Sequence, residues 1–244
     1  MKTITYQIFT LSLLVGLLSG CGSSSAPSKE PPPIPPPGPM LSFDVSVSNL
    51  TNAQPMSPVA ILVHDGSYQT WAIGMPASEG LEDLAESGSP ASLGSEAVSS
   101  STSVYGYTAG TGMIAPGDSE TITVTFEEES VAVLSMASML VNTNDAFVGA
   151  QNVDLSQLDV GDSSQLNLMV FDAGTEANTE TAASVPGPAS GGEGQGFNAV
   201  RDDLGVVTRH SGVVTSSDGY SASVLTQAHR FESTAAQVTI RRTQ

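Results

Sequence analysis

The feature that most constrains the fold of this chain is a strict alternation of apolar and polar residues in short segments. Residues 41–48 alternate four apolar with four polar residues, and residues 121–126 place an apolar residue at every second position. Successive side chains of a β-strand point to opposite faces, so a period of two is typical of a strand with one buried face. These segments predict a sheet with one side on a core.

Other apolar segments of strand length lie along the chain and are separated by turn residues. The chain contains 24 Gly, and a long segment rich in Gly, Ser and Glu, residues 175–196, is expected to be a loop. Short strands joined by turns favour an all-β fold, an antiparallel β-sandwich in one domain. The further strand candidates are residues 59–63, 69–73, 131–141, 165–171, 205–208, 221–225 and 236–241.

One short helix is predicted within residues 78–88. Ser78 can cap its N-terminus, and Glu79 and Glu82 suit the positive end of a helix dipole. Three apolar residues share one face, and Gly88 can end the helix. The sandwich is therefore expected to carry one short helical insertion.

The N-terminus has the pattern of a lipoprotein signal peptide, residues 1–20. Lys2 precedes an apolar run, residues 8–18, which is shorter than the roughly 20 residues that a membrane-spanning helix needs. The run ends in the letters LSGC, with small residues before Cys21. We expect cleavage before Cys21 and a lipid on it. The alternative is an ordinary secretory signal with an incidental cysteine.

The residues around and after the cysteine predict how the protein is held. Gly22 stands where an inner-membrane retention signal has aspartate, so the expected location is the cell envelope, lipid-anchored at the outer membrane. Residues 21–39 form a lipidated tether rich in Ser and Pro, and proline runs favour extended polyproline II. A disordered leader with no spacing role is the alternative. The β-domain is expected to span residues 40–244.

The charge of the chain excludes one class of partner. Without the signal peptide it has 6 basic and 25 acidic residues, a net charge of −19. Such a surface repels phosphate groups, so we expect no nucleic-acid partner. Acidic clusters also attract divalent cations, and only their arrangement decides whether they bind one.

Motifs for catalysis are missing from the sequence. It has no Gly-x-Ser-x-Gly elbow, no phosphate-binding loop and no dinucleotide fingerprint. His64, His210 and His229 lie far apart and are expected to be surface or hydrogen-bonding residues, and Trp71 is expected to pack in the core. No enzyme activity is predicted, although a chain with 25 acidic residues offers carboxylate pairs for a glycan hydrolase by chance.

Three acids lie in the segments that come directly after predicted strands, and they are candidate metal ligands. Asp145 follows the segment 131–141, whereas Asp172 and Glu176 follow the segment 165–171. A sandwich gathers its loops at strand ends, and Ca²⁺ prefers carboxylate, amide and carbonyl oxygens. If residues 121–126 and 131–141 form a hairpin, Glu120 lies at the same end as Asp145.

The same hairpin would place Glu127, Glu128 and Glu129 at the opposite end, where we expect a solvated turn.

Five stretches together resemble the spondin domain, the N-terminal module of F-spondin and mindin. They are SNLTNAQPMSP (48–58), HDGSY (64–68), PASEGL (76–81), SMLVNTNDAF (138–147) and FDAGTEAN (171–178). The resemblance implies an eight-stranded sandwich similar to calcium-dependent membrane-binding domains, with one bound calcium ion and no enzyme activity. Asp145 and Asp172 occupy ligand positions. A third family carboxylate lies on the preceding strand, where this sequence reads TVTF.

The sequence therefore predicts a non-catalytic, calcium-binding adhesion or ligand-binding module displayed on the bacterial envelope. Its expected partners are the membrane, through the lipid anchor, and a protein or glycan ligand. Two alternatives stay open: an envelope-associated hydrolase acting on glycans, and a purely structural envelope lipoprotein.

Overall fold

The computed structural model of the chain describes residues 38–129, 131–232 and 234–244. The predicted signal peptide, Cys21 and nearly all of the predicted tether lie outside the described residues. Within the part that is described, no helix is both long enough and apolar enough to cross a membrane.

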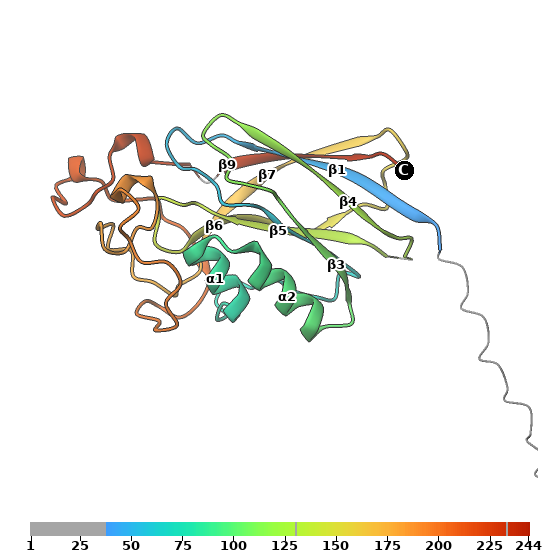
Figure 1. Ribbon diagram of the computed structural model, residues 1–244, viewed down its shortest axis with the longest axis horizontal. Helices are drawn as coiled ribbons and strands as arrows, with labels where there is room; N and C mark the ends of the chain where they lie inside the picture. The colour runs from blue at the N-terminus through green and yellow to red at the C-terminus, as the bar shows by residue number, and fades with distance from the viewer. Residues whose placement is uncertain (1–37, 130, 233) are drawn as a thin grey trace, which may run out of the picture. The chain divides into compact units, whose positions relative to one another are not determined.

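The strands form one antiparallel sheet that curls until its two halves face each other, so that its edges nearly close (Figure 1). Along the sheet the order is β3-β2-β5-β6-β7-β9-β1-β4, and the short β8 pairs with β7. The all-β prediction is thus confirmed. The strands are β1 (Met40–Asn49), β2 (Ala60–His64), β3 (Val104–Ala109), β4 (Ser119–Glu127), β5 (Val133–Met139), β6 (Ala146–Asp154), β7 (Ser163–Asp172), β8 (Thr208–Arg209) and β9 (Thr234–Arg242).

The alternating segments form the strands that the pattern predicts. β1 pairs with β4 from Met40 to Ser48, with Val45 opposite Ile122, and the apolar residues of both strands face the core. Phe43 and Phe126 stack there with ring centroids 5.8 Å apart. β5 is buried at every residue, because the core covers one face and the helices cover the other.

The predicted helix is confirmed as α1 (Glu79–Ser87). The Ser78 hydroxyl accepts a hydrogen bond from Leu81 N at 3.2 Å, and Gly88 ends the helix with a positive φ of 75°. A second helix, α2 (Pro90–Ser100), follows and was not predicted, because its many Ser residues and its Gly have weak helix propensity. Three 3₁₀ turns are η1 (Pro188–Ser190), η2 (Ser216–Asp218) and η3 (Gln227–His229).

Several strand predictions were wrong. Residues 69–73 form no strand, since the Gln151 side chain accepts from Thr70 N and Trp71 N and takes the place of a neighbouring strand. Residues 221–225 pack as a loop in a small core around Leu225. Of residues 205–208 only the last enters β8, and β3 and β6 were not predicted.

The predicted hairpin of residues 121–126 with 131–141 is also wrong. β4 pairs with β1, whereas β5 lies between β2 and β6. The residue patterns explain this difference: β4 has a polar face that needs solvent, whereas β5 is apolar enough to be buried on both faces.

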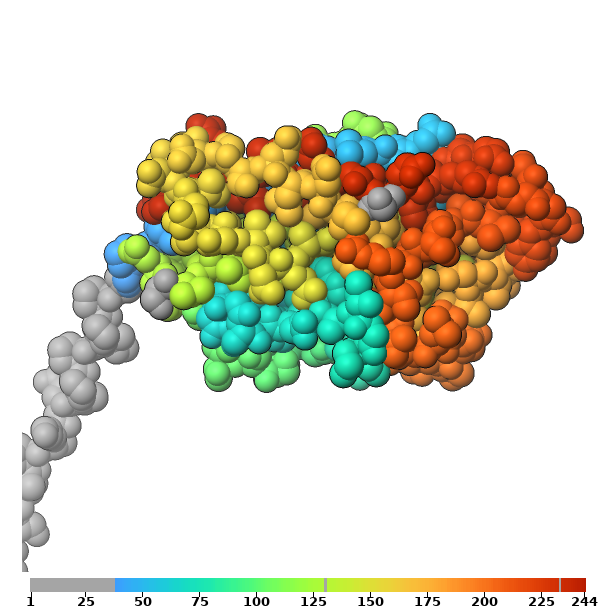
Figure 2. Space-filling model, turned by 180° about the vertical axis from the view of Figure 1, so that it is seen from behind, coloured from blue at the N-terminus to red at the C-terminus, as the bar shows by residue number. Residues whose placement is uncertain are grey.

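The register gives the sheet two distinct ends. The Met40 end is where β1, β5 and β7 begin, and the Asp145 end is where these three strands finish. The long segment after β7, drawn in orange in Figure 2, packs at the Asp145 end beside the teal segment before α1. The two segments are joined by hydrogen bonds of 2.8 Å from Gly74 N to Val207 O and from Val207 N to Met75 O.

Candidate cation site

Asp145 and Asp172 meet because β6 and β7 are neighbours. Asp145 directly precedes β6, and Asp172 is the last residue of β7, paired with Ala146. Ala173 N donates to Asp145 O at 3.2 Å, which fixes the two turns to each other. The structure thus brings both predicted residues to one end of adjacent strands.

Asp145 is fully buried, and only one of its carboxylate oxygens is satisfied. Oδ2 accepts from Thr175 N at 2.8 Å, Glu176 N at 3.1 Å and the Thr175 hydroxyl at 3.3 Å. Oδ1 has no partner among the described residues. Burial first, and then the negative charge of Asp172, raise the pKa of Asp145 to about 7.

Asp172 has a different set of partners. Its Oδ1 accepts from Gly174 N at 2.8 Å, and its Oδ2 accepts from Asn178 Nδ2 at 2.7 Å. The buried His210 places Nε2 4.0 Å from Asp172 Oδ2. Because His210 Nδ1 accepts from Gly212 N, its proton resides on Nε2 and faces Asp172.

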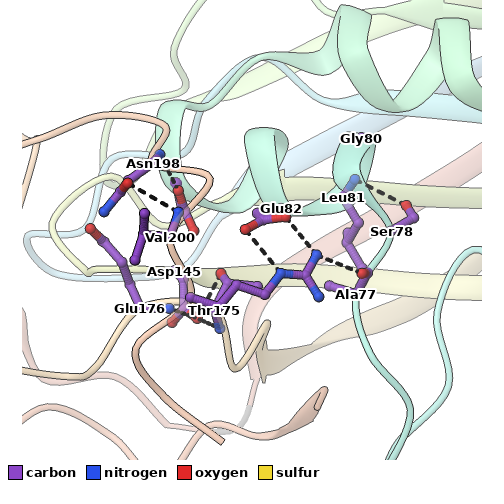
Figure 3. A network of polar contacts seen from close by, with 12 residues as sticks. Ala77, Ser78, Gly80, Leu81, Glu82, Asp145, Thr175, Glu176, Asn198 and Val200 are labelled. Carbon is purple, nitrogen blue, oxygen red and sulfur yellow. Dashed lines mark hydrogen bonds and ion pairs between the residues drawn. The ribbon is translucent and has the colours of Figure 1, made fainter. Parts of the chain in front are cut away.

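Glu176, the third predicted residue, is buried against other acids. Its Oε2 has no partner among the described residues. Burial, and then the charges of Glu86, Asp145 and Asp202, raise its pKa to about 8. Figure 3 shows Asp145, Thr175 and Glu176 grouped near Asn198, beside the Glu82 network.

Arg201 brings a positive charge to this region, and Glu82 binds it. Arg201 Nε and one terminal nitrogen donate to the two Glu82 oxygens at 3.0 and 2.5 Å, and the same terminal nitrogen donates to Ala77 O. The positive charge is therefore directed at Glu82 rather than at Asp145 or Glu176.

One feature of this region suits a hard cation, namely buried oxygens without a partner. Asn144 is fully buried with both atoms of its amide unpartnered, and Glu86, Asp145 and Glu176 each have one unpartnered oxygen among the described residues. Ca²⁺ takes six to eight oxygens from such groups. In the described part of the chain, no three His, Cys, Asp or Glu side chains lie close enough to hold a metal ion as they stand. The region therefore offers a cation unpartnered oxygens, but not a group of acids already in place around it.

The other sequence candidates lie elsewhere or have structural partners. Glu120 lies in β4 opposite Val47, towards the Asp145 end, and its Oε1 accepts from Thr111 N and the Thr111 hydroxyl. Glu127, Glu128 and Glu129 are exposed at the Met40 end. Trp71 packs in the core against Phe147 and Phe171, as predicted.

The histidines make hydrogen bonds, as expected. His64 Nε2 bonds to the Ser135 hydroxyl at 2.8 Å, and His229 Nδ1 accepts from Thr226 N at 2.9 Å. Sequence reasoning missed the contact of His210 with Asp172 and the burial of Glu86 and Asn144. Of these residues, only Asn144 could have been found from the sequence, because it stands next to the candidate ligand Asp145.

The prominent clefts of the described residues are lined by other side chains. One, about 450 Å³, lies among residues 111–120, and another, about 270 Å³, lies between β3 and β4. Neither Asp145 nor Glu176 lines these clefts.

Comparison with known protein families shows what the chain is similar to. A family model described as Spondin_N matches residues 50–189, more than half of the chain. The matched residues include Asp145, Asp172 and Glu176, whereas His210 and β9 lie beyond them. No curated protein matches the chain.

Proposed function

The chain belongs to the Spondin_N family, and on that premise we propose that it is a non-catalytic, calcium-binding adhesion module displayed on the bacterial envelope. Family membership indicates a ligand-binding or adhesion module. The calcium ion, the lipid on Cys21 and the envelope location are our additions, and a protein or glycan is the expected ligand.

The observation that carries the calcium proposal is the group of buried, unpartnered oxygens at the Asp145 end. A buried carboxylate without a counterion is costly, and either a proton or a cation removes the cost. Asp145, Asp172 and Glu176 are the residues that would hold the ion. When bound, the ion would neutralise charge and fix the turns after β5 and β7, and no reaction step is assigned to it.

The position of the candidate site also supports display of the domain on the envelope. β1 has 10 residues, so it separates Met40 from the Asp145 end by roughly 30 Å. An anchor that joins the domain at Met40 would leave the candidate site and its loops at the far end of the sheet. Those loops are the surface we assign to ligand binding, and a pull-down with calcium and with chelator tests this assignment.

Asp172→Asn is expected to abolish calcium binding. Extracellular modules bind calcium with dissociation constants near 10⁻⁴ to 10⁻³ M, so millimolar calcium would stabilise the wild type by about 0.4 to 1.4 kcal/mol. This corresponds to a few degrees in melting temperature, which calorimetry measures. The Asp172 variant should stay folded without the calcium-dependent shift.

Glu128→Gln is the matched control, because Glu128 is exposed at the Met40 end. It should keep the calcium-dependent shift. No calcium binding to the wild type, or loss of the shift in the Glu128 variant alone, would contradict the proposed site.

Cys21→Ser is expected to leave the protein uncleaved by lipoprotein signal peptidase and without a fatty-acid label. The reason is that the enzyme cuts before a cysteine that already carries lipid, and serine has no thiol to receive it. Metabolic labelling with palmitate and membrane fractionation check this outcome. A labelled, membrane-bound serine variant would disprove the anchor.

A further inference from the structure

The sheet has two free edges, β3 and β4, which face each other where it nearly closes (Figure 1). In the described part of the chain, β3 pairs only with β2 and β4 pairs only with β1. A free edge carries a row of unpaired N–H and C=O groups that can pair with a further strand. The space between β3 and β4 is therefore a seam lined by backbone donors and acceptors.

The register of β4 shows which of its backbone groups face the seam. Glu128 N donates to Pro39 O at 2.8 Å, just beyond the paired ends of β4 and β1. In an antiparallel ladder every second residue bonds to the neighbouring strand, so the even-numbered residues of β4 bond to β1. The N–H and C=O groups of Thr121, Thr123 and Thr125 therefore point into the seam.

The same reasoning applies to β3 on the other side of the seam. Gly110 N donates to Val59 O at 2.8 Å, so the even-numbered residues of β3 bond to β2. The backbone groups of Tyr105 and Tyr107 are therefore directed into the seam.

The seam is closed towards the Asp145 end and open towards the Met40 end. At the closed end, Glu120 Oε1 accepts from Thr111 N at 2.6 Å, and a Cβ on Gly110 would lie 2.6 Å from Glu120 Oε2. The open part is the cleft of about 270 Å³ between the two strands. This cleft is smaller than the roughly 300 to 1,000 Å³ of small-molecule pockets, so it suits a few side chains rather than a whole ligand.

The lining of the open part is apolar and aromatic on its inner side. Val63, Val124 and Phe126 line it together with Tyr105 and Tyr107. Val124 and Phe126 belong to the buried face of β4, so a strand added to this edge would bring every second side chain onto the same face. The cleft thus favours apolar residues at alternate positions of the added strand.

β4 lacks the usual protection of a free edge. Proteins often protect such edges with Pro, with Lys or with a bulge. β4 has nine residues without Pro or Lys, and its register with β1 has no shift. A long, regular edge of this kind is suited to pairing.

The charge at the open end selects the kind of strand. Glu127 and Glu129 line the cleft, and none of the residues described as lining it is basic. Burial, and then the charges of Glu129 and Asp65, raise the pKa of Tyr105, in agreement with an acidic opening. A positively charged segment is favoured there, whereas a second copy of this chain, with its net charge of −18, is repelled.

We propose that the seam binds an extended segment of a partner protein, a strand of alternating apolar and basic residues that pairs its backbone with β4. The apolar side chains enter the cleft beside Phe126, and the basic side chains lie near Glu127 and Glu129. The added strand continues the sheet, a known mode of peptide recognition. This surface goes beyond the proposed function, because it is separate from the loops at the Asp145 end and needs no calcium.

A short synthetic peptide that alternates valine and lysine is the probe, and calorimetric titration of the full chain measures its binding. The comparison is the same peptide N-methylated at every residue, which keeps the charge but has no backbone donors. We expect the N-methylated peptide to bind at least about tenfold more weakly, because it cannot pair with an edge. A peptide that alternates valine and glutamate should not bind.

Thr125→Pro tests the edge from the side of the protein. Proline removes the N–H that faces the seam and leaves the bonds to β1 in place, which an edge strand tolerates. Thr125→Val is the matched control, since both variants lose the hydroxyl that lies 3.3 Å from the Ser42 hydroxyl, but valine keeps the N–H. The affinity for the valine–lysine peptide should fall at least about tenfold in Thr125→Pro and change less than about twofold in Thr125→Val. If Thr125→Pro does not fold, the N-methylated peptide decides with the wild type.

Three results would overturn the proposal. One is a wild type that does not bind the valine–lysine peptide. Another is equal binding of the N-methylated peptide, which would show that charge alone attracts it. The third is a wild-type dimer that Thr125→Pro dissociates, which would assign the edge to a second copy. Binding should be the same in CaCl₂ and in chelator, so a failure of the calcium proposal leaves this one standing.

Discussion

The two ends of the sheet use the same residue type in opposite ways. At the Met40 end, Glu127, Glu128 and Glu129 form an acidic run that is exposed at every residue. At the Asp145 end, Asp145 and Glu86 are fully buried and have unpartnered oxygens. The exposed acids keep their water, whereas the buried acids have lost it without gaining a counterion. The comparison shows that position in the fold, rather than acidity, makes a candidate site.

The glycines at the two ends differ in the same way. Gly161, in the turn between β6 and β7 at the Met40 end, has a positive φ of 98°, and a Cβ there would meet nothing within 4 Å. Gly174, beside Asp172, has a φ of 71°, and a Cβ there would lie 2.2 Å from Val206 O. The turn at the Asp145 end thus packs backbone against backbone.

The largest expected effect comes from Gly174→Ala. The alanine would meet both an unfavourable positive φ and a clash with the Val206 carbonyl, so we expect a loss of about 3 to 5 kcal/mol in the free energy of unfolding. Gly161→Ala has only the unfavourable φ and should lose about 1 kcal/mol. Urea unfolding of both variants measures the difference. Equal losses would break the contrast between the two turns.

A pH dependence of stability is expected to come from the Asp145 end. The pKa of Asp145 and of Glu180 is about 7 and that of Glu176 about 8, all raised chiefly by burial. Between about pH 4 and these values the folded state holds protons that the unfolded state has released. In the presence of chelator, stability should therefore fall as the pH rises from about 5 to 8.

Glu180 has a raised pKa but lies outside the candidate site, so Glu180→Gln tests its contribution to the pH dependence separately. Glu180 is buried, and its Oε1 accepts from Val214 N at 3.1 Å, a bond that glutamine can keep. The variant should be more stable than the wild type at pH 8 by up to about 3 kcal/mol, and equally stable at pH 4. Denaturation in chelator at several pH values checks this. A gain at pH 4 of the same size would show that charge is not the cause.

The smallest effect is expected at the Met40 end. Replacing Glu127, Glu128 and Glu129 together by Gln should change the free energy of unfolding by less than about 0.5 kcal/mol at physiological salt, because exposed charges are screened. The pH dependence of stability should stay that of the wild type. A large change would mean that the exposed run contacts the fold after all.

The sequence by itself determined the elements with strong local signals. The period-two segments became β1 and β4, and Ser78 and Gly88 bounded α1 as their capping preferences predict. Asp145 and Asp172 could be placed at strand ends because Asp172 directly follows an apolar run and Asp145 lies in the short polar segment after another. These features depend on neighbours in the chain, so a sequence pattern is enough to find them.

Only the tertiary structure decided which strands pair and which acids are buried. β4 pairs with β1 rather than with β5, and α1 places Glu86 in the interior beside the turns that hold Asp145 and Glu176. A helical glutamate is usually solvated, and nothing in its sequence neighbourhood marks it as buried. Burial and its cost depend on residues that are far apart in the chain, and folding alone brings those residues together.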